Sequence, residues 1–414
     1  MSIFVELHAL RAFPPSNLNR DDLGTPKTAI FGGARRLRIS SQCLKRTWRT
    51  SEHFRGAFAE EQLGIRTDRL PQQVLSAVGP TLDDRAREGL LALLASIGKK
   101  SGTTSRGYDE GDETGSEDEA EIAQEPRTAH LLFLSRQEIE VVASFVKENA
   151  DALAKVIAKK KPNVDAIKIL RAKLEDYLRR HTSKNAVDVG LFGRFVTSDE
   201  FDTIDAALQV AHGLGTQRIE IEYDYFTAVD DLNSDAGASH LGETEFASSV
   251  LYLYACCDLA QLEANLGART VNGRAPDAEA RALARRSLPA LVRAVAEATP
   301  KGKKTGTAPH TPAEYVEVVV RRGAPVSFAN AFSKPVGLQE HGGDAMAASI
   351  ARLSNHRNRI ESAYGRDRDV IARLVLRLRD VDGFEPKGCE VVSIDDLAAS
   401  LERELDARSA QSNA

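Results

Sequence analysis

Residues Ser16–Arg49 read SNLNRDDLGTPKTAIFGGARRLRISSQCLKRTWR and combine a Gly-Gly turn, an Arg-Arg pair and a basic helical pattern. Between residues 11 and 50 the chain has nine Lys or Arg and only two Asp, although its formal net charge is −5. Positive charge concentrated beside a glycine-containing loop is typical of a surface that binds phosphate groups. The alternative is a basic surface that is merely solvated, and the helix in this stretch favours the first interpretation.

The end of this stretch predicts an amphipathic helix that begins at Ser40 or Ser41, because both residues are good N-caps. At about 100° per residue, one side of this helix carries Leu44, Trp48, Ser51, Arg55 and Phe58. The opposite side carries Gln42, Lys45, Arg46 and Arg49. The first side can pack on a core while the second presents its cations along one line. The helix N-terminus adds N–H groups suited to an anionic oxygen, and Gly32-Gly33 permits a tight turn close to a ligand.

Several further motifs carry a family resemblance. They are Leu18–Asp22, Lys27, Ala29–Gly33, Arg35-Arg36, Arg38–Gln42, Leu44–Arg46, Gly193-Arg194, Ala211-His212, Asp224–Leu232, Ser239–Gly242 and Ser327–Phe332. In this order they resemble the backbone subunit of the type I-E CRISPR Cascade complex, the CasC family of repeat-associated RNA-binding proteins. The resemblance is dense over residues 1–50 and 187–268 and thin elsewhere.

This resemblance implies an α+β fold shaped like a right hand. It comprises a ferredoxin-like (RRM-like) palm, a helical fingers insertion and a projecting β-hairpin thumb. The implied boundaries are 1–60 for the first part of the palm, 61–186 for the fingers, and 187–414 for the remainder of the palm, with the thumb at 219–246. The residue pattern alone predicts only a sheet that is split by a helical insertion and carries one protruding hairpin.

The pattern along the rest of the chain adds detail. Residues 2–12 alternate as a half-buried strand, in which His8 is interpreted as a structural side chain. Ser135–Glu138 predicts a capping box at the start of a helix, and residues 187–232 are expected to be mostly strand, followed by a central strand over 250–259. The loop 105–126 is acidic and contains nine acidic and no basic residues between Asp109 and Glu125. Such a segment is typical of disorder, and the other interpretation is an autoinhibitory mimic of nucleic acid.

The resemblance implies that copies of the chain polymerise along a CRISPR guide RNA within the Cascade surveillance complex of antiviral defence. The implied partners are the guide RNA, a target DNA strand, neighbouring copies and other Cascade subunits. Because guide sequences vary, the contacts should be made to phosphate and 2′-OH groups. The expected RNA backbone contacts are Arg20, Lys27, Arg35, Arg36, Arg38, Ser40, Gln42, Lys45, Arg46 and Arg49. The expected base-displacing wedges are Phe195 and Phe226, for which ordinary packing on the sheet is an equal alternative. The basic segment Lys155–Lys161 is a candidate contact for target DNA.

Two other function classes are open. The pair Asp21-Asp22 could belong to a metal-dependent endoribonuclease, since two carboxylates can hold the metal that cleaves a phosphodiester. Adjacent residues rarely converge on one ion, so capping of the loop or pairing with Arg20 or Arg38 is the favoured interpretation. We therefore expect no enzymatic activity, no cofactor and no metal site. A free-standing mRNA-binding protein is the third class, and it would show sequence preference and bind as a monomer.

Composition is compatible with this picture. Hydrophobic residues make up 42% of the chain and charged residues 28%, as in ordinary globular proteins. No apolar run reaches the roughly 18 residues of a membrane span, so no membrane partner is expected. The four cysteines, at positions 43, 256, 257 and 389, form no CxxC motif. This spacing indicates reduced thiols and predicts a cytoplasmic protein.

Overall fold

The computed structural model describes residues 2–97, 127–158, 161–182, 185–196, 198–228, 240–267, 277–382, 384 and 387–412. The chain divides into two compact units, a sheet unit (1–59, 207–264 and 268–414) and a helical unit (60–206 and 265–267). The predicted fingers insertion ended at residue 186, whereas the helical unit continues to residue 206. The predicted acidic loop 105–126 lies outside the described residues.

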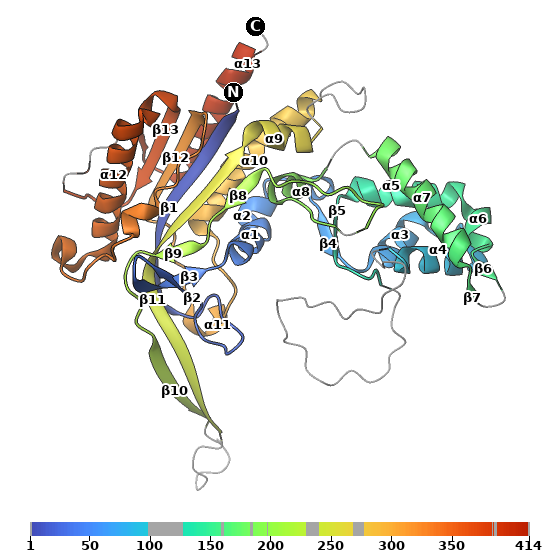
Figure 1. The fold of residues 1–414 in the computed structure, drawn as a ribbon, viewed down its shortest axis with the longest axis horizontal. Helices are drawn as coiled ribbons and strands as arrows, with labels where there is room; N and C mark the ends of the chain where they lie inside the picture. The colour runs from blue at the N-terminus through green and yellow to red at the C-terminus, as the bar shows by residue number, and fades with distance from the viewer. Residues whose placement is uncertain are drawn as a thin grey trace. The chain divides into compact units, whose positions relative to one another are not determined.

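The sheet unit is built on β1 (Ile3–Ser16), which pairs antiparallel with β11 (His240–Asp258) on one side and with β12 (Tyr315–Arg322) on the other. The strand order is β14-β13-β12-β1-β11-β9-β3-β2, and β8 and β10 also pair with β11. The other strands are β2 (Thr28–Phe31), β3 (Ala34–Ile39), β8 (Leu208–Val210), β9 (Gly213–Gly215), β10 (Glu222–Ala228), β13 (Val370–Arg377) and β14 (Cys389–Val391). The first strand of the chain therefore lies inside the sheet (Figure 1).

Helices cover both faces of the sheet at β1. The apolar side of α12 (Ala345–Tyr364) packs on Leu10 and its neighbours. The next residue, Arg11, donates a hydrogen bond to the carbonyl oxygen of Ala298, just after α10 (Ala278–Glu297). Because adjacent residues of a strand point to opposite faces, α12 and α10 lie on opposite sides of β1 (Figure 1). The prediction of a half-buried strand is wrong, since residues 5–11 are all buried.

The sheet unit contains further α-helices among its described residues. They are α1 (Ser41–Arg49), α2 (Glu52–Arg55), α11 (Lys304–Thr307) and α13 (Ile394–Ser412), and α9 (Leu259–Asn265) runs across the boundary between the units. The long α13 packs along α10, and its first turn is capped by Ser393, which accepts a hydrogen bond from the N–H of Asp396. Among the described residues, no helix is long and apolar enough to span a membrane.

A network of buried charges lies between the sheet and α12. It contains Glu6, Glu317, Glu361, Arg321, Arg357 and Arg373, joined by ion pairs. Equal numbers of carboxylates and guanidinium groups meet the requirement that buried charges be paired. Beside them, His8 Nδ1 is 2.8 Å from the hydroxyl of Tyr252, and its ring stacks on Phe328. Burial lowers the pKa of His8 to about 3, so His8 is a neutral structural side chain.

The predicted hairpin is present. In it, β10 pairs with the first part of β11, from Glu222 opposite Phe246 to Ala228 opposite His240. Both strands project away from the rest of the sheet (Figure 1). The segment 229–239, which includes most of the predicted tip, lies outside the described residues. The predicted central strand over 250–259 is the continuation of β11, which pairs there with β1, β8 and β9.

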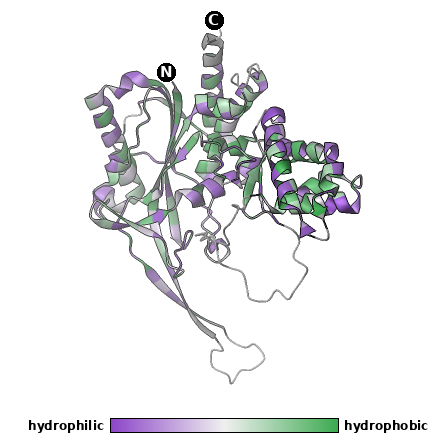
Figure 2. Ribbon diagram, turned by 45° about the vertical axis from the view of Figure 1, so that its right-hand side comes forward, coloured by the Kyte–Doolittle hydropathy of each residue, from purple (hydrophilic) through white to green (hydrophobic). Residues whose placement is uncertain are grey.

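The helical unit packs its helices around their apolar sides, which Figure 2 shows in green where the helices meet. Its helices are α3 (Leu70–Val78), α4 (Asp84–Ala95), α5 (Arg136–Glu148), α6 (Ala150–Ala154), α7 (Val164–His181) and α8 (Val187–Phe192), and its strand pairs are β4 (Ile65–Thr67) with β5 (Leu132–Leu134) and β6 (Ile157–Ala158) with β7 (Lys161–Pro162). The predicted capping box is confirmed: the side chain of Ser135 accepts from the N–H of Glu138, whose carboxylate accepts from the N–H of Ser135.

The strand predicted at the start of 187–232 is wrong, because residues 187–192 form the short helix α8. A Cβ added to Gly190 would lie 2.9 Å from the side chain of Leu266, so the glycine allows this helix to approach its neighbour closely. Asp188 accepts a 2.7 Å hydrogen bond from the N–H of Gly64 and holds the start of the helix in place. A short apolar run with two glycines fits a buried helix turn as well as a strand.

Candidate nucleic-acid interface

The loop between β1 and β2 is closed by its own side chains. Asp21 accepts hydrogen bonds from the N–H groups of Leu23 and Thr25 and from the Thr25 hydroxyl. The hydroxyl hydrogen bond of Thr25 holds the pKa of Asp21 below its ordinary value. The N–H of Lys27 donates to the carbonyl oxygen of Asn19 at 2.8 Å. Asp21 therefore caps the loop that carries Arg20 and Lys27. Among the described residues, no group of three His, Cys, Asp or Glu could hold a metal ion.

Arg35 and Arg36 are neighbours on β3 and therefore point to opposite faces. Arg35 is exposed, whereas Arg36 is completely buried. The guanidinium of Arg36 donates hydrogen bonds to four carbonyl oxygens, those of Gly215, Thr216, Phe332 and Ser333. The prediction that Arg36 binds the RNA backbone is wrong, because its donors tie β3 to the end of β9 and to the end of the segment Ser327–Phe332.

The Gly-Gly turn has a structural reason as well. Gly32 adopts a φ of +57°, which favours glycine, and a Cβ at this position would lie 1.5 Å from the carbonyl oxygen of Ser333. The turn therefore packs directly against Ser333, whose carbonyl oxygen also accepts a hydrogen bond from Arg36. This contact fixes the β2–β3 hairpin on which Arg35 and Arg38 lie.

Helix α1 follows the predicted phase. Leu44 and Trp48 are buried, while Gln42 and Arg46 are exposed and Lys45 and Arg49 are half-buried. The helix ends at Arg49, and Ser51 caps the new helix α2, so Ser51, Arg55 and Phe58 do not continue the same stripe as predicted.

The predicted N-cap of α1 is confirmed at Ser40. Its hydroxyl accepts a 3.3 Å hydrogen bond from the N–H of Cys43. Its own N–H donates to the side chain of Asn19 at 2.8 Å. With only 8% of its surface exposed, Ser40 positions the helix and joins it to the loop that carries Arg20.

Six cations on α1, on β3 and in the β1–β2 loop stand outside the ion pairs of the described residues. Among the described residues, none forms an ion pair with Arg20, Lys27, Arg35, Arg38, Lys45 or Arg46. Burial lowers the pKa of Lys45, so its ammonium is partly desolvated and would gain from an anionic partner. The N–H of Arg38 donates to the carbonyl oxygen of Lys27, which places these two residues side by side. Unpaired cations so arranged suit a phosphate backbone.

His212, which the sequence reasoning did not select as a site residue, completes this surface. Its Nδ1 accepts a 3.0 Å hydrogen bond from the N–H of Ser41, in the first turn of α1. Burial and, after it, the charge of Arg38 lower the pKa of His212, which favours the neutral ring. Nε2 then carries the proton and is a donor at the start of α1. His212 is close to α1 only because the fold brings together Ser41 and His212, which are 171 residues apart in the sequence. The Ala211-His212 motif of the family resemblance is the one sequence feature that indicated this residue.

The two predicted wedge residues differ in exposure. The ring of Phe226 on β10 is 46% exposed and lies over Gly242, where an added Cβ would be 2.2 Å from it. Phe195, in the helical unit just after α8, is 83% exposed, which excludes packing on a sheet face within that unit. Tyr223 and Tyr225 on β10 are also exposed, and the sequence reasoning did not select them. The hairpin thus presents three aromatic side chains to solvent.

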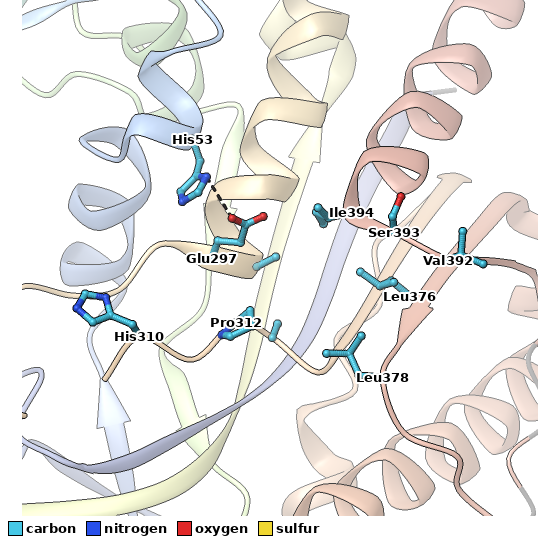
Figure 3. Close-up of a pocket in the computed structure, with 11 residues that line it drawn as sticks. His53, Glu297, His310, Pro312, Leu376, Leu378, Val392, Ser393 and Ile394 are labelled. Atoms are coloured by element: carbon cyan, nitrogen blue, oxygen red, sulfur yellow. Dashed lines mark ion pairs between the residues drawn. The ribbon is translucent and has the colours of Figure 1, made fainter. Parts of the chain in front are cut away.

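The sheet unit has a cavity of about 480 Å³, whose lining residues Figure 3 shows and which none of these cations lines. Apolar side chains dominate its lining, which includes Pro312, Leu376, Leu378, Val392 and Ile394. Beside them His53 and Glu297 form an ion pair with 3.3 Å between Nδ1 and Oε2. None of the predicted site residues lines it, and a carboxylate in the lining is unfavourable for phosphate.

A family model and solved structures match the chain over almost its whole length. A model of the CT1975-like protein family matches residues 5–400. A chain of a pre-nicking CRISPR RNA-guided surveillance complex is 30% identical, with 96% of this chain and 100% of that chain covered and a TM-score of 0.73. A chain of another CRISPR RNA-guided surveillance complex is 25% identical, with 96% and 99% covered and a TM-score of 0.63. No curated protein sequence matches. The chain therefore belongs to the CT1975-like protein family.

Proposed function

We propose that this chain is the guide-RNA-binding backbone subunit of a Cascade surveillance complex of the type I-E kind. Its similarity to chains of CRISPR RNA-guided surveillance complexes supports a role in such an assembly. The observation that carries the RNA-binding part is the group of Arg20, Lys27, Arg35, Arg38, Lys45 and Arg46, for which the described residues provide no ion pair. In an acidic chain, cations left unpaired on one surface indicate an anionic ligand.

The contacts would be independent of base sequence. Lys27, Arg38, Lys45 and Arg46 offer charge to phosphate oxygens, and the neutral ring of His212 offers a hydrogen bond to a phosphate or a 2′-OH group. These groups lie on a strand, a helix and a closed loop rather than on free segments. They would therefore hold the RNA in a fixed path whatever its sequence.

In this proposal the three parts of the hand have separate roles. The sheet unit is the RRM-like palm, the helical unit is the fingers, and the β10–β11 hairpin is the thumb that reaches a neighbouring copy. Phe226 and Phe195 would insert between bases and displace one of them. Lys155 and Lys161, both exposed, would face the target DNA strand.

Two measurements test RNA binding. The purified protein should carry a mixture of short RNAs that share repeat-derived ends. If about five phosphates are neutralised per copy, the logarithm of the association constant should fall with the logarithm of salt concentration with a slope of about −3 to −4. A flat salt response, or a single RNA sequence selected from the mixture, would contradict the proposal.

Self-assembly is tested through the hairpin. Replacing residues 228–241 by a short glycine linker should leave a folded protein that binds short RNA. Cooperative assembly on long RNA should be lost, because the hairpin would no longer reach the next copy. Regular arrays formed by the deletion variant would show that the hairpin is only an edge of its own sheet.

The endoribonuclease alternative is less favoured, because both carboxylate oxygens of Asp21 accept hydrogen bonds within the loop. Incubation with matched RNA and Mg²⁺ or Mn²⁺ separates the two functions. RNA cleavage that persists through purification and disappears in Asp21→Ala would favour the nuclease.

A further inference from the structure

A second group of lysines lies far along the chain, in the lysine loop Thr299–Pro309, which reads TPKGKKTGTAP. Lys301 and Lys303 are exposed and Lys304 is half-buried. None of the three ammonium groups forms an ion pair within the described part of the chain. Three cations within four residues repel one another, so an anion against the loop would relieve this repulsion.

Both ends of the lysine loop are fastened to β1. The buried guanidinium of Arg11 donates 2.6 Å hydrogen bonds to the carbonyl oxygen of Ala298 and to the hydroxyl of Thr299. Beyond the other end, the hydroxyl of Thr311 donates to the carbonyl oxygen of Ala12 at 2.6 Å. The lysines are therefore held on the central strand of the sheet and are not on a free segment.

Within the loop, Gly302 and Lys303 make two contacts that fix its position. A Cβ at Gly302 would lie 2.3 Å from the carbonyl oxygen of Leu18, so only glycine permits this approach to the loop that carries Arg20 and Lys27. Lys303, whose φ of +41° is unusual for a residue with a side chain, places its Nζ 3.4 Å from the hydroxyl of Thr244 on β11. The lysine loop thus touches both the basic loop and the base of the hairpin.

The contact with Thr244 places Lys303 on the face of the hairpin that carries Phe226. Thr244 lies directly opposite Asp224, and two residues away Gly242 lies opposite Phe226. Residues directly opposite each other, and residues two apart on one strand, share a face. Asp224 forms no ion pair with Lys303 in the described structure. The lysine loop therefore lies one cross-strand pair from the ring of Phe226.

Displacing a base bends the RNA backbone at that nucleotide. A bend brings neighbouring phosphates closer together and raises their mutual repulsion, so a cation at the bend stabilises the bent form more than the extended one. A lysine ammonium suits this role because it is a compact point charge with rotatable donors.

We propose that Lys301, Lys303 and Lys304 bind the phosphodiester groups of the guide RNA on either side of the nucleotide that Phe226 displaces, an assignment that rests on the function proposed above. The cations of α1 would then hold the regular part of the backbone, and the lysine loop would hold the bend. Removal of the two groups should have different consequences. Loss of the α1 cations weakens binding along the whole RNA, whereas loss of the lysine loop also relaxes the bend.

The test uses the full chain with Lys301, Lys303 and Lys304 all changed to Gln. The matched control changes Arg359, Arg368 and Arg403 to Gln, because these exposed cations of the sheet unit remove the same charge elsewhere. Binding is measured against salt on a single-stranded RNA that accommodates several copies. Base displacement is measured by the fluorescence of 2-aminopurine moved through successive positions, at saturating protein. Fluorescence of the buried Trp48 verifies that each variant is folded.

We expect the triple Gln variant to lose about 2 from the magnitude of the salt slope, at about 0.7 for each phosphate contact on a single strand. The periodic 2-aminopurine signal should disappear even at saturation. The control should match the wild type, and changing the same three lysines to Arg should restore both readouts. Gly302→Val keeps the charges but pushes the loop away from Leu18, so it should lose the periodic signal with little change in slope.

The possible failures can be told apart. If the wild type binds no RNA, the proposed function fails and this assignment fails with it. If the wild type binds and displaces bases and the triple Gln variant does the same, only the lysine assignment is overturned. A reduced slope with a wild-type periodic signal overturns the placement at the bend. Unchanged RNA binding with weaker capture of complementary DNA overturns the choice of guide RNA and assigns the lysines to the target strand.

Discussion

Changing Arg36 to Met should destabilise the sheet unit without altering its RNA-binding surface, whereas Arg35→Met should do the opposite. The two residues are adjacent and carry the same side chain, and the sequence alone predicts the same role for both. In the structure one guanidinium is solvated and the other is enclosed by carbonyl oxygens. The pair of substitutions therefore makes the same chemical change at two positions that differ only in environment.

The structure sets the size of the effect. Arg36 donates hydrogen bonds of 2.8 to 3.2 Å to four carbonyl oxygens, and methionine keeps much of the buried volume while removing every donor. Thr216 retains a second donor, the N–H of Val336, so its carbonyl oxygen is not left without a partner. At about 1 kcal/mol for each of the remaining three hydrogen bonds, the free energy of unfolding should fall by about 3 kcal/mol.

The assay uses the single tryptophan of the chain, Trp48, which is buried in α1 of the same unit. Its fluorescence during urea denaturation reports the unfolding of the sheet unit. Arg36→Met should unfold at clearly lower urea and keep the wild-type salt slope of RNA binding. Arg35→Met should unfold with the wild type and reduce the magnitude of the slope by about 0.7. An Arg36→Met protein with wild-type stability and a reduced slope would refute this reasoning.

Three further predictions address the loop, the helix and the core. Lys45→Ala combined with Arg49→Ala should weaken binding to all RNA sequences about equally and reduce the magnitude of the salt slope by about 1.4. Titration on several unrelated RNAs measures both effects, and a loss confined to one sequence would indicate base readout. Asp21→Ala should open the β1–β2 loop and lower RNA affinity without changing any metal-dependent turnover, and a cleavage assay run beside the binding titration would expose a contrary result. The pKa of His8 is about 3 in the folded protein and about 6.5 when unfolded, so its contribution to stability is complete above pH 6.5. This contribution is lost as the pH falls toward 3, at about 1.4 kcal/mol per pH unit. His8→Gln should flatten that part of the plot of unfolding free energy against pH, and an unchanged plot would exclude His8 as its cause.

Local patterns predicted the elements that depend on neighbouring residues. The capping box at Ser135 and the burial of Leu44 and Trp48 follow from hydrogen bonds and side-chain spacing within one or two turns. The alternation of apolar and aromatic with charged residues over 218–225 likewise predicted a hairpin strand, and β10 overlaps it. These features need no knowledge of the rest of the chain.

Features set by distant partners were not predictable in the same way. Charge suggests that Arg36 is exposed, and only the carbonyl groups of residues 215–216 and 332–333 explain its burial. The first strand was expected to face water on one side, but α12 covers that side, and Glu6 finds its partners in Arg321, Tyr254 and the N–H of Val326. The position of Lys303 beside the hairpin depends on contacts with residues 18 and 244, which no spacing in the sequence relates to it.

The 19 residues of β11 have a mechanical consequence. One part of this strand pairs with β1 in the central sheet and the other part pairs with β10 in the hairpin, so the backbone runs from sheet to hairpin without a loop between them. Its reach is therefore counted in residues, at about 3.4 Å each, or roughly 24 Å for the seven residues of β10. Lengthening both arms by two residues would extend this reach by about 7 Å and keep Phe226 on its present side. Lengthening them by one would turn the ring to the opposite side. The hairpin therefore sets the distance between its base and whatever Phe226 contacts, and this distance can change only in steps of two residues if the ring is to stay on the same side.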